Sequence, residues 1–95
     1  MSNKKYIRKP EVMDLRLKRL YGITLEEYKA RMLKQDSRCA ICGGVNKSGK
    51  QLAVDHHHIT GKVRGLLCSN CNNGLGLFQD NPELLNKAAA YIKYQ

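Results

Sequence analysis

Four cysteines in two identically spaced pairs carry the clearest chemical signal in this 95-residue sequence. Cys39 and Cys42 form one Cys-x-x-Cys pair, Cys68 and Cys71 form the other, and 25 residues separate the two pairs. Two such pairs can supply the four thiolates of a tetrahedral zinc site, because each pair can wrap one edge of the tetrahedron from a tight turn. The spacing therefore predicts one structural zinc ion held by all four cysteines.

The insert between the cysteine pairs holds all three histidines of the protein, in the run Val54-Asp55-His56-His57-His58. An imidazole can accept a proton near neutral pH, and a carboxylate is a suitable ligand for a hard cation such as Mg²⁺. Histidines that are contiguous here and absent elsewhere indicate chemistry. We therefore expect a second, catalytic site that is built on the zinc scaffold.

Short elements must position this second site. The insert reads as a strand over residues 52–55, a loop over 56–61 and an antiparallel strand over 62–67. A short helix over 69–77 then begins inside the second cysteine pair. In regular strand geometry Asp55 and His56 would face opposite ways, so the chain must bend where the first strand ends.

Helices are predicted on both sides of the insert. One runs from residue 11 to a stop at Gly22, and a second begins at an N-cap Thr24 with a capping box. The last helix has Asn81 as N-cap and Pro82 in its first turn, and it extends to about residue 92. We expect this helix to close the core, and its exposed face could pair with a second subunit as a homodimer.

Charge and length bound the class of protein. The net charge is +9, and residues 1–35 contribute +6 of it, which favours a polyanionic partner such as nucleic acid. No apolar run approaches the roughly 20 residues of a membrane span, and no signal peptide is evident, so we expect a cytoplasmic protein without a membrane partner. We divide the chain into a basic helical extension, residues 1–35, and a zinc-bound domain, residues 36–95, that together form one compact domain.

Other uses of four cysteines stay open at this point. They could form two disulfides in an exported chain, hold one iron in an electron carrier of the rubredoxin type, or act as thiol oxidoreductase motifs. The paired spacing and the absent export signal disfavour the disulfides, and the basic charge and clustered histidines disfavour the iron carrier. Two motifs with metal-ligand spacing point to ligands rather than to redox chemistry. A zinc-stabilised nucleic-acid-binding module without catalysis is the main alternative to an enzyme.

The stretch from Leu52 to Gly76 resembles the HNH nucleases. Within them it is similar to the phage recombination endonuclease VII family, whose pattern is Asp-His-x-His followed by Gly-Lys-Val-Arg-Gly-Leu-Leu-Cys-x-x-Cys-Asn. The resemblance implies an α+β fold with a small zinc-stabilised ββα-metal core, also called a His-Me finger, flanked by N-terminal and C-terminal helices. It also implies a metal-dependent DNA endonuclease or nickase. Such a protein could be encoded by a phage and act inside the host cell.

The resemblance also assigns roles to positions of this chain. Asp55 and Asn72 would hold the catalytic Mg²⁺ or Mn²⁺, His56 would be the general base, and His58 would be an auxiliary group near the scissile phosphate. The four cysteines would hold zinc. A single cation with two protein ligands keeps open positions for substrate oxygens and water.

Four residues near this site depart from the family pattern or keep two interpretations. Lys62 and Arg64 alternate outward on the second strand and could bind DNA phosphates, or they could form a solvated strand face. His57 stands where the family often has Asp, as a substitute ligand or as a surface residue. Leu75 stands where the family can have Glu, so any role of that Glu is not carried over.

Duplex, nicked or branched DNA are all possible substrates, and RNA also stays open.

Overall fold

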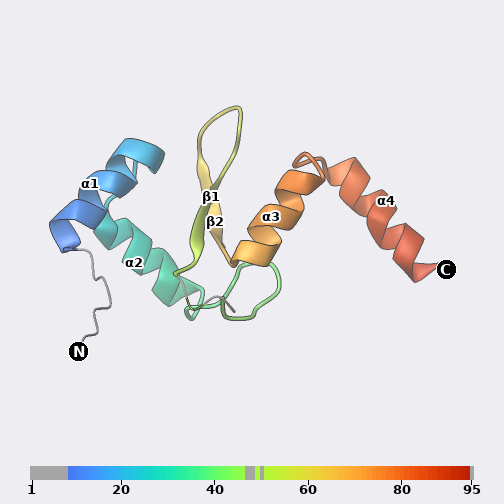
Figure 1. Ribbon diagram of the computed structural model, residues 1–95, viewed down its shortest axis with the longest axis horizontal. Coiled ribbons are helices and arrows are strands. Elements are labelled where there is room, and N and C mark those ends of the chain that lie inside the picture. The colour runs from blue at the N-terminus through green and yellow to red at the C-terminus, as the bar shows by residue number, and fades with distance from the viewer. Residues whose placement is uncertain (1–8, 47–48, 50, 95) are drawn as a thin grey trace.

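The computed structural model describes residues 9–46, 49 and 51–94. Residues 1–8, 47–48, 50 and 95 lie outside them. The six elements follow the predicted order. They are α1 (Pro10–Tyr21), α2 (Leu25–Lys34), β1 (Ala53–His56), β2 (Val63–Leu67), α3 (Ser69–Leu77) and α4 (Pro82–Lys93). The predicted α+β fold is thus confirmed, with the β1–β2 hairpin standing between α1 and α2 on one side and α3 on the other (Figure 1).

The core lies where the hairpin meets α2 and the cysteines. Leu66 on β2 is fully buried and forms one cluster with Ile23, Tyr28 and Val54. The buried Tyr28 hydroxyl donates a 2.7 Å hydrogen bond to the carbonyl of Leu52, which anchors α2 to the start of the hairpin. Residues 23–28 therefore share one core with the insert, and α2 fixes the position of the start of β1.

The helix boundaries follow from local chemistry. The predicted capping box is confirmed, since the Thr24 hydroxyl accepts from the Glu27 N–H at 3.0 Å and the Glu27 carboxylate accepts from the Thr24 N–H at 2.7 Å. Gly22 ends α1 with φ +73°, a left-handed conformation that glycine adopts without strain. Asn81 caps α4 by accepting from the N–H groups of residues 83 and 84.

An irregularity interrupts the hairpin at the end of β1. Asp55 pairs with Gly65, but His56 pairs with Val63, so Arg64 is an extra residue on β2 that has no partner in the ladder. Such a bulge bends the strand and redirects side chains, and it is frequent next to active sites. The extra residue lies on β2, opposite the point where Asp55 and His56 end β1.

The last helix differs from our expectation. We expected α4 to close the core, but it has no buried residue, and Ile92 on its apolar face is 75% exposed. The physical reason lies in the preceding turn, where Gln79 and Asp80 adopt φ of 58° and 56° and redirect the chain. The helix consequently extends beyond α3 (Figure 1). No helix among the described residues is long and apolar enough to cross a membrane.

Candidate active site and metal centre

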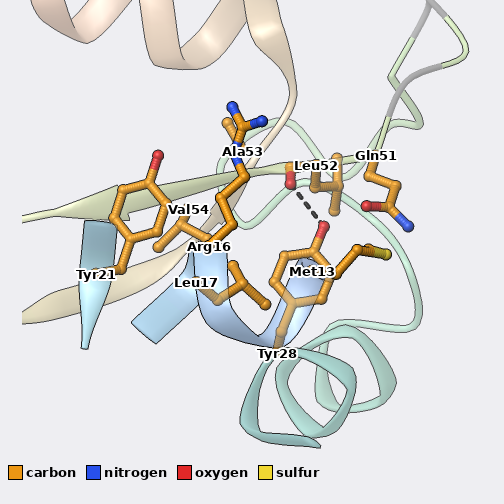
Figure 2. A pocket seen from close by; sticks show the side chains of 9 residues that line it. All are labelled: Met13, Arg16, Leu17, Tyr21, Tyr28, Gln51, Leu52, Ala53 and Val54. Carbon is orange, nitrogen blue, oxygen red and sulfur yellow. Dashed lines mark hydrogen bonds between the residues drawn. The ribbon is translucent and has the colours of Figure 1, made fainter. Parts of the chain in front are cut away.

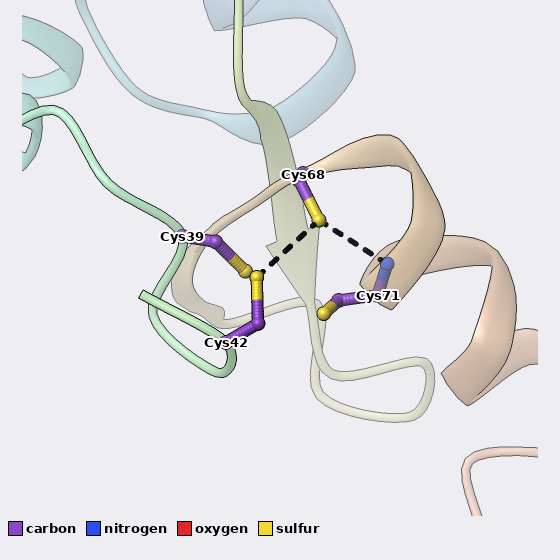
Figure 3. A group of neighbouring side chains, drawn as sticks. All are labelled: Cys39, Cys42, Cys68 and Cys71. Carbon is purple, nitrogen blue, oxygen red and sulfur yellow. Dashed lines mark hydrogen bonds between the residues drawn. The ribbon is translucent and has the colours of Figure 1, made fainter. Parts of the chain in front are cut away.

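The four cysteines converge as their spacing predicts. Their sulfur atoms all lie within 4.8 Å of one another (Figure 3), and the Sγ atoms of Cys42 and Cys68 are 3.9 Å apart. Sulfurs around a tetrahedral zinc with Zn–S bonds of about 2.3 Å would be separated by about 3.8 Å. The donor set and its dimensions therefore fit a structural zinc ion.

Backbone amides surround these sulfurs. Three N–H groups, those of Ile41, Gly44 and Cys71, each lie 3.4 Å from a cysteine sulfur. Burial of the Cys39 thiol would raise its pKa, but hydrogen bonds from neighbouring N–H groups outweigh burial and lower the pKa to about 6. Burial and hydrogen bonds with the other three thiols raise the pKa of Cys71 to about 12. A zinc ion needs all four groups as thiolates, so protons and zinc compete for the same sulfurs.

The predicted catalytic pair lies at the end of β1, beside the bulge. His56 is half-buried, with its ring centroid 5.7 Å from the Tyr21 ring at the end of α1 and 5.4 Å from the His58 ring. The structure thus brings His56 and His58 together from either side of His57. The α1 helix, to which the sequence assigned no chemistry, supplies one wall against the proposed general base.

Asp55 is held by an arginine. The Arg64 guanidinium donates from Nε to Asp55 Oδ2 at 2.7 Å and from Nη2 to Asp55 Oδ1 at 3.0 Å. Nη2 also donates to Asp80 Oδ1 at 2.9 Å. Hydrogen bonds to both carboxylates raise the pKa of Arg64 above its usual range, and the bond from Arg64 lowers the pKa of Asp80. We call these three residues the carboxylate cluster.

The other residues that the sequence singled out lie outside the carboxylate cluster. Asn72 lies half-buried on α3, which packs against both strands, but no hydrogen bond among the described residues joins its side chain to Asp55 or His56. Lys62 is exposed at the end of the loop. His57 is half-buried and holds that loop, because its Nδ1 accepts from the N–H groups of Ile59 and Thr60, each at 3.2 Å.

A pocket lies beside the start of β1. It has a volume of about 430 Å³ and lies between α1, α2 and β1 (Figure 2). Arg16 and Tyr21 from α1 line it together with the Tyr28–Leu52 hydrogen bond. It is separate from the carboxylate cluster, since neither Asp55 nor Arg64 lines it.

The comparison with known families matches almost the whole described chain. The model of the family described as recombination endonuclease VII matches residues 14–94. The chain belongs to the recombination endonuclease VII family. The match extends beyond the stretch from Leu52 to Gly76 that carried the resemblance, back to the middle of α1 and forward through α4.

Two phage proteins and one solved structure are similar to this endonuclease VII family member. The gene 59 protein of Mycobacterium phage D29 is 47% identical over 81 residues, 84% of this chain and 49% of the relative. The gene 59 protein of Mycobacterium phage L5 is 44% identical over 80 residues, 83% of this chain and 49% of the relative. The chain thus spans about half the length of the curated relatives it matches.

The solved structure is the ββα-Me type II restriction endonuclease Hpy99I. It aligns with a TM-score of 0.52 and 33% sequence identity, over 80% of this chain and 45% of Hpy99I. With the hairpin, α3 and the cysteine cluster, this likeness confirms the predicted zinc-type ββα-metal fold.

Sequence reasoning missed two residues of this family member's site. Asp80 follows α3 and binds Arg64, and only the turn between α3 and α4 brings it there. Gln35, just after α2, donates from Nε2 to the carbonyls of Arg38 and Leu66 and accepts from the Leu66 N–H. Neither residue has a spacing signal, because Arg64 is 16 residues from Asp80 and Leu66 is 31 residues from Gln35. Leu75, where the family can have Glu, packs against the core.

Proposed function

We propose that this chain is a metal-dependent DNA endonuclease or nickase that hydrolyses phosphodiester bonds. The observation that carries the proposal is the position of Asp55 and His56 at a bulged strand end, in a ββα-metal fold of the recombination endonuclease VII family. The zinc-fitting cluster stabilises the start of α3, so the chain's small core need not hold the site alone.

The residues divide the reaction between them. His56 accepts the proton of the attacking water, because a neutral imidazole is a suitable base near neutral pH. Asp55 and Asn72 would hold Mg²⁺ or Mn²⁺ through a carboxylate and an amide oxygen. The cation, when bound, neutralises charge on the phosphate and the leaving oxygen. His58, whose ring lies 5.4 Å from His56, is an auxiliary group on the same edge.

The charge of the chain supports a DNA substrate. A net charge of +9 attracts the phosphate backbone at long range, and the exposed Lys62 lies close to the site along the chain. A phage-encoded enzyme of this kind would act in the cytoplasm of the host cell. The competing function is a zinc-stabilised binding module that holds DNA without cutting it.

Conversion of supercoiled plasmid to nicked or linear DNA, with Mg²⁺ or Mn²⁺, tests this function. We expect His56→Ala to lower the cleavage rate by about 10² to 10⁴-fold, the usual contribution of a general base, while a gel-shift assay shows unchanged DNA binding. Asp55→Asn should likewise abolish cleavage.

The matched control is Asp36→Asn, which removes the same charge from an exposed turn at the end of α2. It should cut at the wild-type rate. If His56→Ala cuts as fast as the wild type, the catalytic assignment is wrong. If the wild type binds DNA but does not cut it with either cation, the binding module is the better description. Parallel assays on linear duplex, branched DNA and RNA would define the substrate class.

A further inference from the structure

We infer that Asp80 is a positioning residue for the cation site. When a divalent cation displaces Arg64 from Asp55, the hydrogen bond to Asp80 keeps Arg64 beside the site. The inference rests on the proposed role of Asp55 as a cation ligand and extends it to two residues to which the family resemblance gives no part in cation binding.

Arg64 and a cation require the same atoms. Both oxygens of Asp55 accept from the guanidinium, at 2.7 Å and 3.0 Å. The Asp55 side chain is only 12% exposed, so few directions of approach remain. A cation that binds Asp55 must therefore weaken or displace at least one of these hydrogen bonds. In the absence of the cation, Arg64 neutralises a carboxylate that would otherwise be half-buried and unpaired.

Asp80 provides the alternative partner. Its carboxylate accepts from Arg64 Nη2 at 2.9 Å, the same nitrogen that donates to Asp55. An arginine that leaves Asp55 thus keeps a charged partner and remains beside the site. The released donors then suit a phosphate oxygen, which a guanidinium binds in the same bidentate way as a carboxylate.

The backbone presents Asp80 rigidly. The N–H of Asp80 donates to the carbonyl of Leu75 at 2.8 Å, and the N–H of Gln79 donates to the carbonyl of Gly76 at 2.9 Å. These two bonds are the pair that closes a Schellman motif at a helix end. They hold Asp80 at the end of α3, the helix that Cys68 caps and whose first turn contains Cys71.

Asp80 also faces solvent on the side of His58. Its Oδ2 lies 4.0 Å from His58 Nε2, and the two residues line an open pocket of about 260 Å³ together with Gly76 and Gln79.

Binding of Mn²⁺ to the zinc-loaded protein, measured by electron paramagnetic resonance of free Mn²⁺, tests the inference without reference to cleavage. Asp80→Asn leaves Arg64 with Asp55 as its only carboxylate partner, so Mn²⁺ binding should weaken by about tenfold, the ratio that one charge-assisted hydrogen bond supports. Arg64→Gln removes the competitor and should tighten Mn²⁺ binding by a similar factor.

The double variant decides whether Asp80 acts through Arg64. In the Arg64→Gln background, Asp80→Asn should change Mn²⁺ affinity by less than about twofold, because no arginine remains to be retained. An equal loss in both backgrounds would mean that Asp80 acts on the cation directly, and it would overturn the inference. So would an unchanged affinity of the single Asp80→Asn variant.

Two controls separate this inference from the proposed function. Asp36→Asn has the same charge change in a similar left-handed turn and should bind Mn²⁺ like the wild type. Asp55→Asn should lose Mn²⁺ binding. If Asp55→Asn binds Mn²⁺ normally, the cation assignment of the proposed function fails. If it does not, while Asp80→Asn behaves like the wild type, only the inference fails.

Discussion

The cysteine cluster and the carboxylate cluster are two polar centres of one small fold, and they are built on opposite principles. The four sulfurs come from two short turns, and backbone N–H groups approach them at 3.4 Å. The carboxylate cluster joins residues of β1, β2 and the turn after α3, and a cationic side chain of the protein already pairs its acidic groups.

This difference separates a permanent site from an exchangeable one. The four sulfurs lie within 4.8 Å of one another, and no hydrogen bond among the described residues pairs them with a cationic side chain. A soft cation that binds them therefore becomes part of the fold. Asp55 has a cationic partner in Arg64, so the fold can exist with or without a cation there. The proposed nuclease would need this combination, because its scaffold must persist while its catalytic centre exchanges ligands.

Removal of one sulfur should have the largest effect. Cys68→Ser breaks the zinc site, and structural zinc contributes about 10 to 16 kcal/mol of apparent folding free energy in small domains, which matches or exceeds the whole stability of most domains. We expect loss of bound zinc, of native far-UV circular dichroism and of the cooperative melting transition. Ser69→Ala, one residue further along α3, should retain all three. A Cys68→Ser protein with a native spectrum and unchanged melting temperature would remove zinc from its scaffold role.

Substitution of Gln35, which lies beside the cysteine cluster, should cause the next largest loss of stability. Its amide bonds to Leu66 and to the carbonyl of Arg38, next to Cys39, and so ties the two cysteine pairs together. Gln35→Ala leaves the N–H of the fully buried Leu66 without this acceptor, at a cost of about 1 to 3 kcal/mol. The melting temperature should fall by at least about 4 °C. Gln51→Ala, at an exposed position, should change it little.

Local patterns predicted most of this fold, and contacts between distant residues account for the rest. The capping box at Thr24, the Asn81 cap and the cysteine spacing each depend on neighbours within a few residues, and all appear as predicted. The bulge at Arg64 and the role of Asp80 depend on how the hairpin and the turn after α3 meet. Amphipathic periodicity placed α4 correctly along the chain but could not say that its apolar face stays uncovered.

Substitution of His57 tests whether this residue holds the loop between β1 and β2, beside the carboxylate cluster. Its Nδ1 accepts from two loop N–H groups, a task that an Asp carboxylate performs equally well in a turn. We expect His57→Ala to accelerate hydrogen exchange at the Ile59 and Thr60 amides and to destabilise the protein by about 1 kcal/mol. His57→Asp should restore both properties. If both variants exchange at the wild-type rate, His57 does not hold the loop.

The smallest effect concerns pH, and it separates the two clusters directly. Arg64 holds the pKa of Asp80 below its ordinary value. The stabilisation is therefore fully present above the ordinary carboxyl pKa of about 4 and is lost only as the pH falls through the lower folded-state value. The Asp80 side chain is 19% exposed, so solvent screens the pair and Asp80→Asn should destabilise by less than about 1 kcal/mol.

Between about pH 8 and 5.5 this difference between wild type and Asp80→Asn should not shrink, because the carboxylate remains ionised throughout. The zinc-dependent melting temperature of both proteins should fall over the same range, since protons compete with zinc for the thiolates. Thermal melts at several pH values, with zinc content measured in parallel, check both statements. A difference that shrinks well above pH 5 would mean that Asp80 is not held ionised by Arg64, and that the carboxylate cluster is as sensitive to acid as the sulfur cluster.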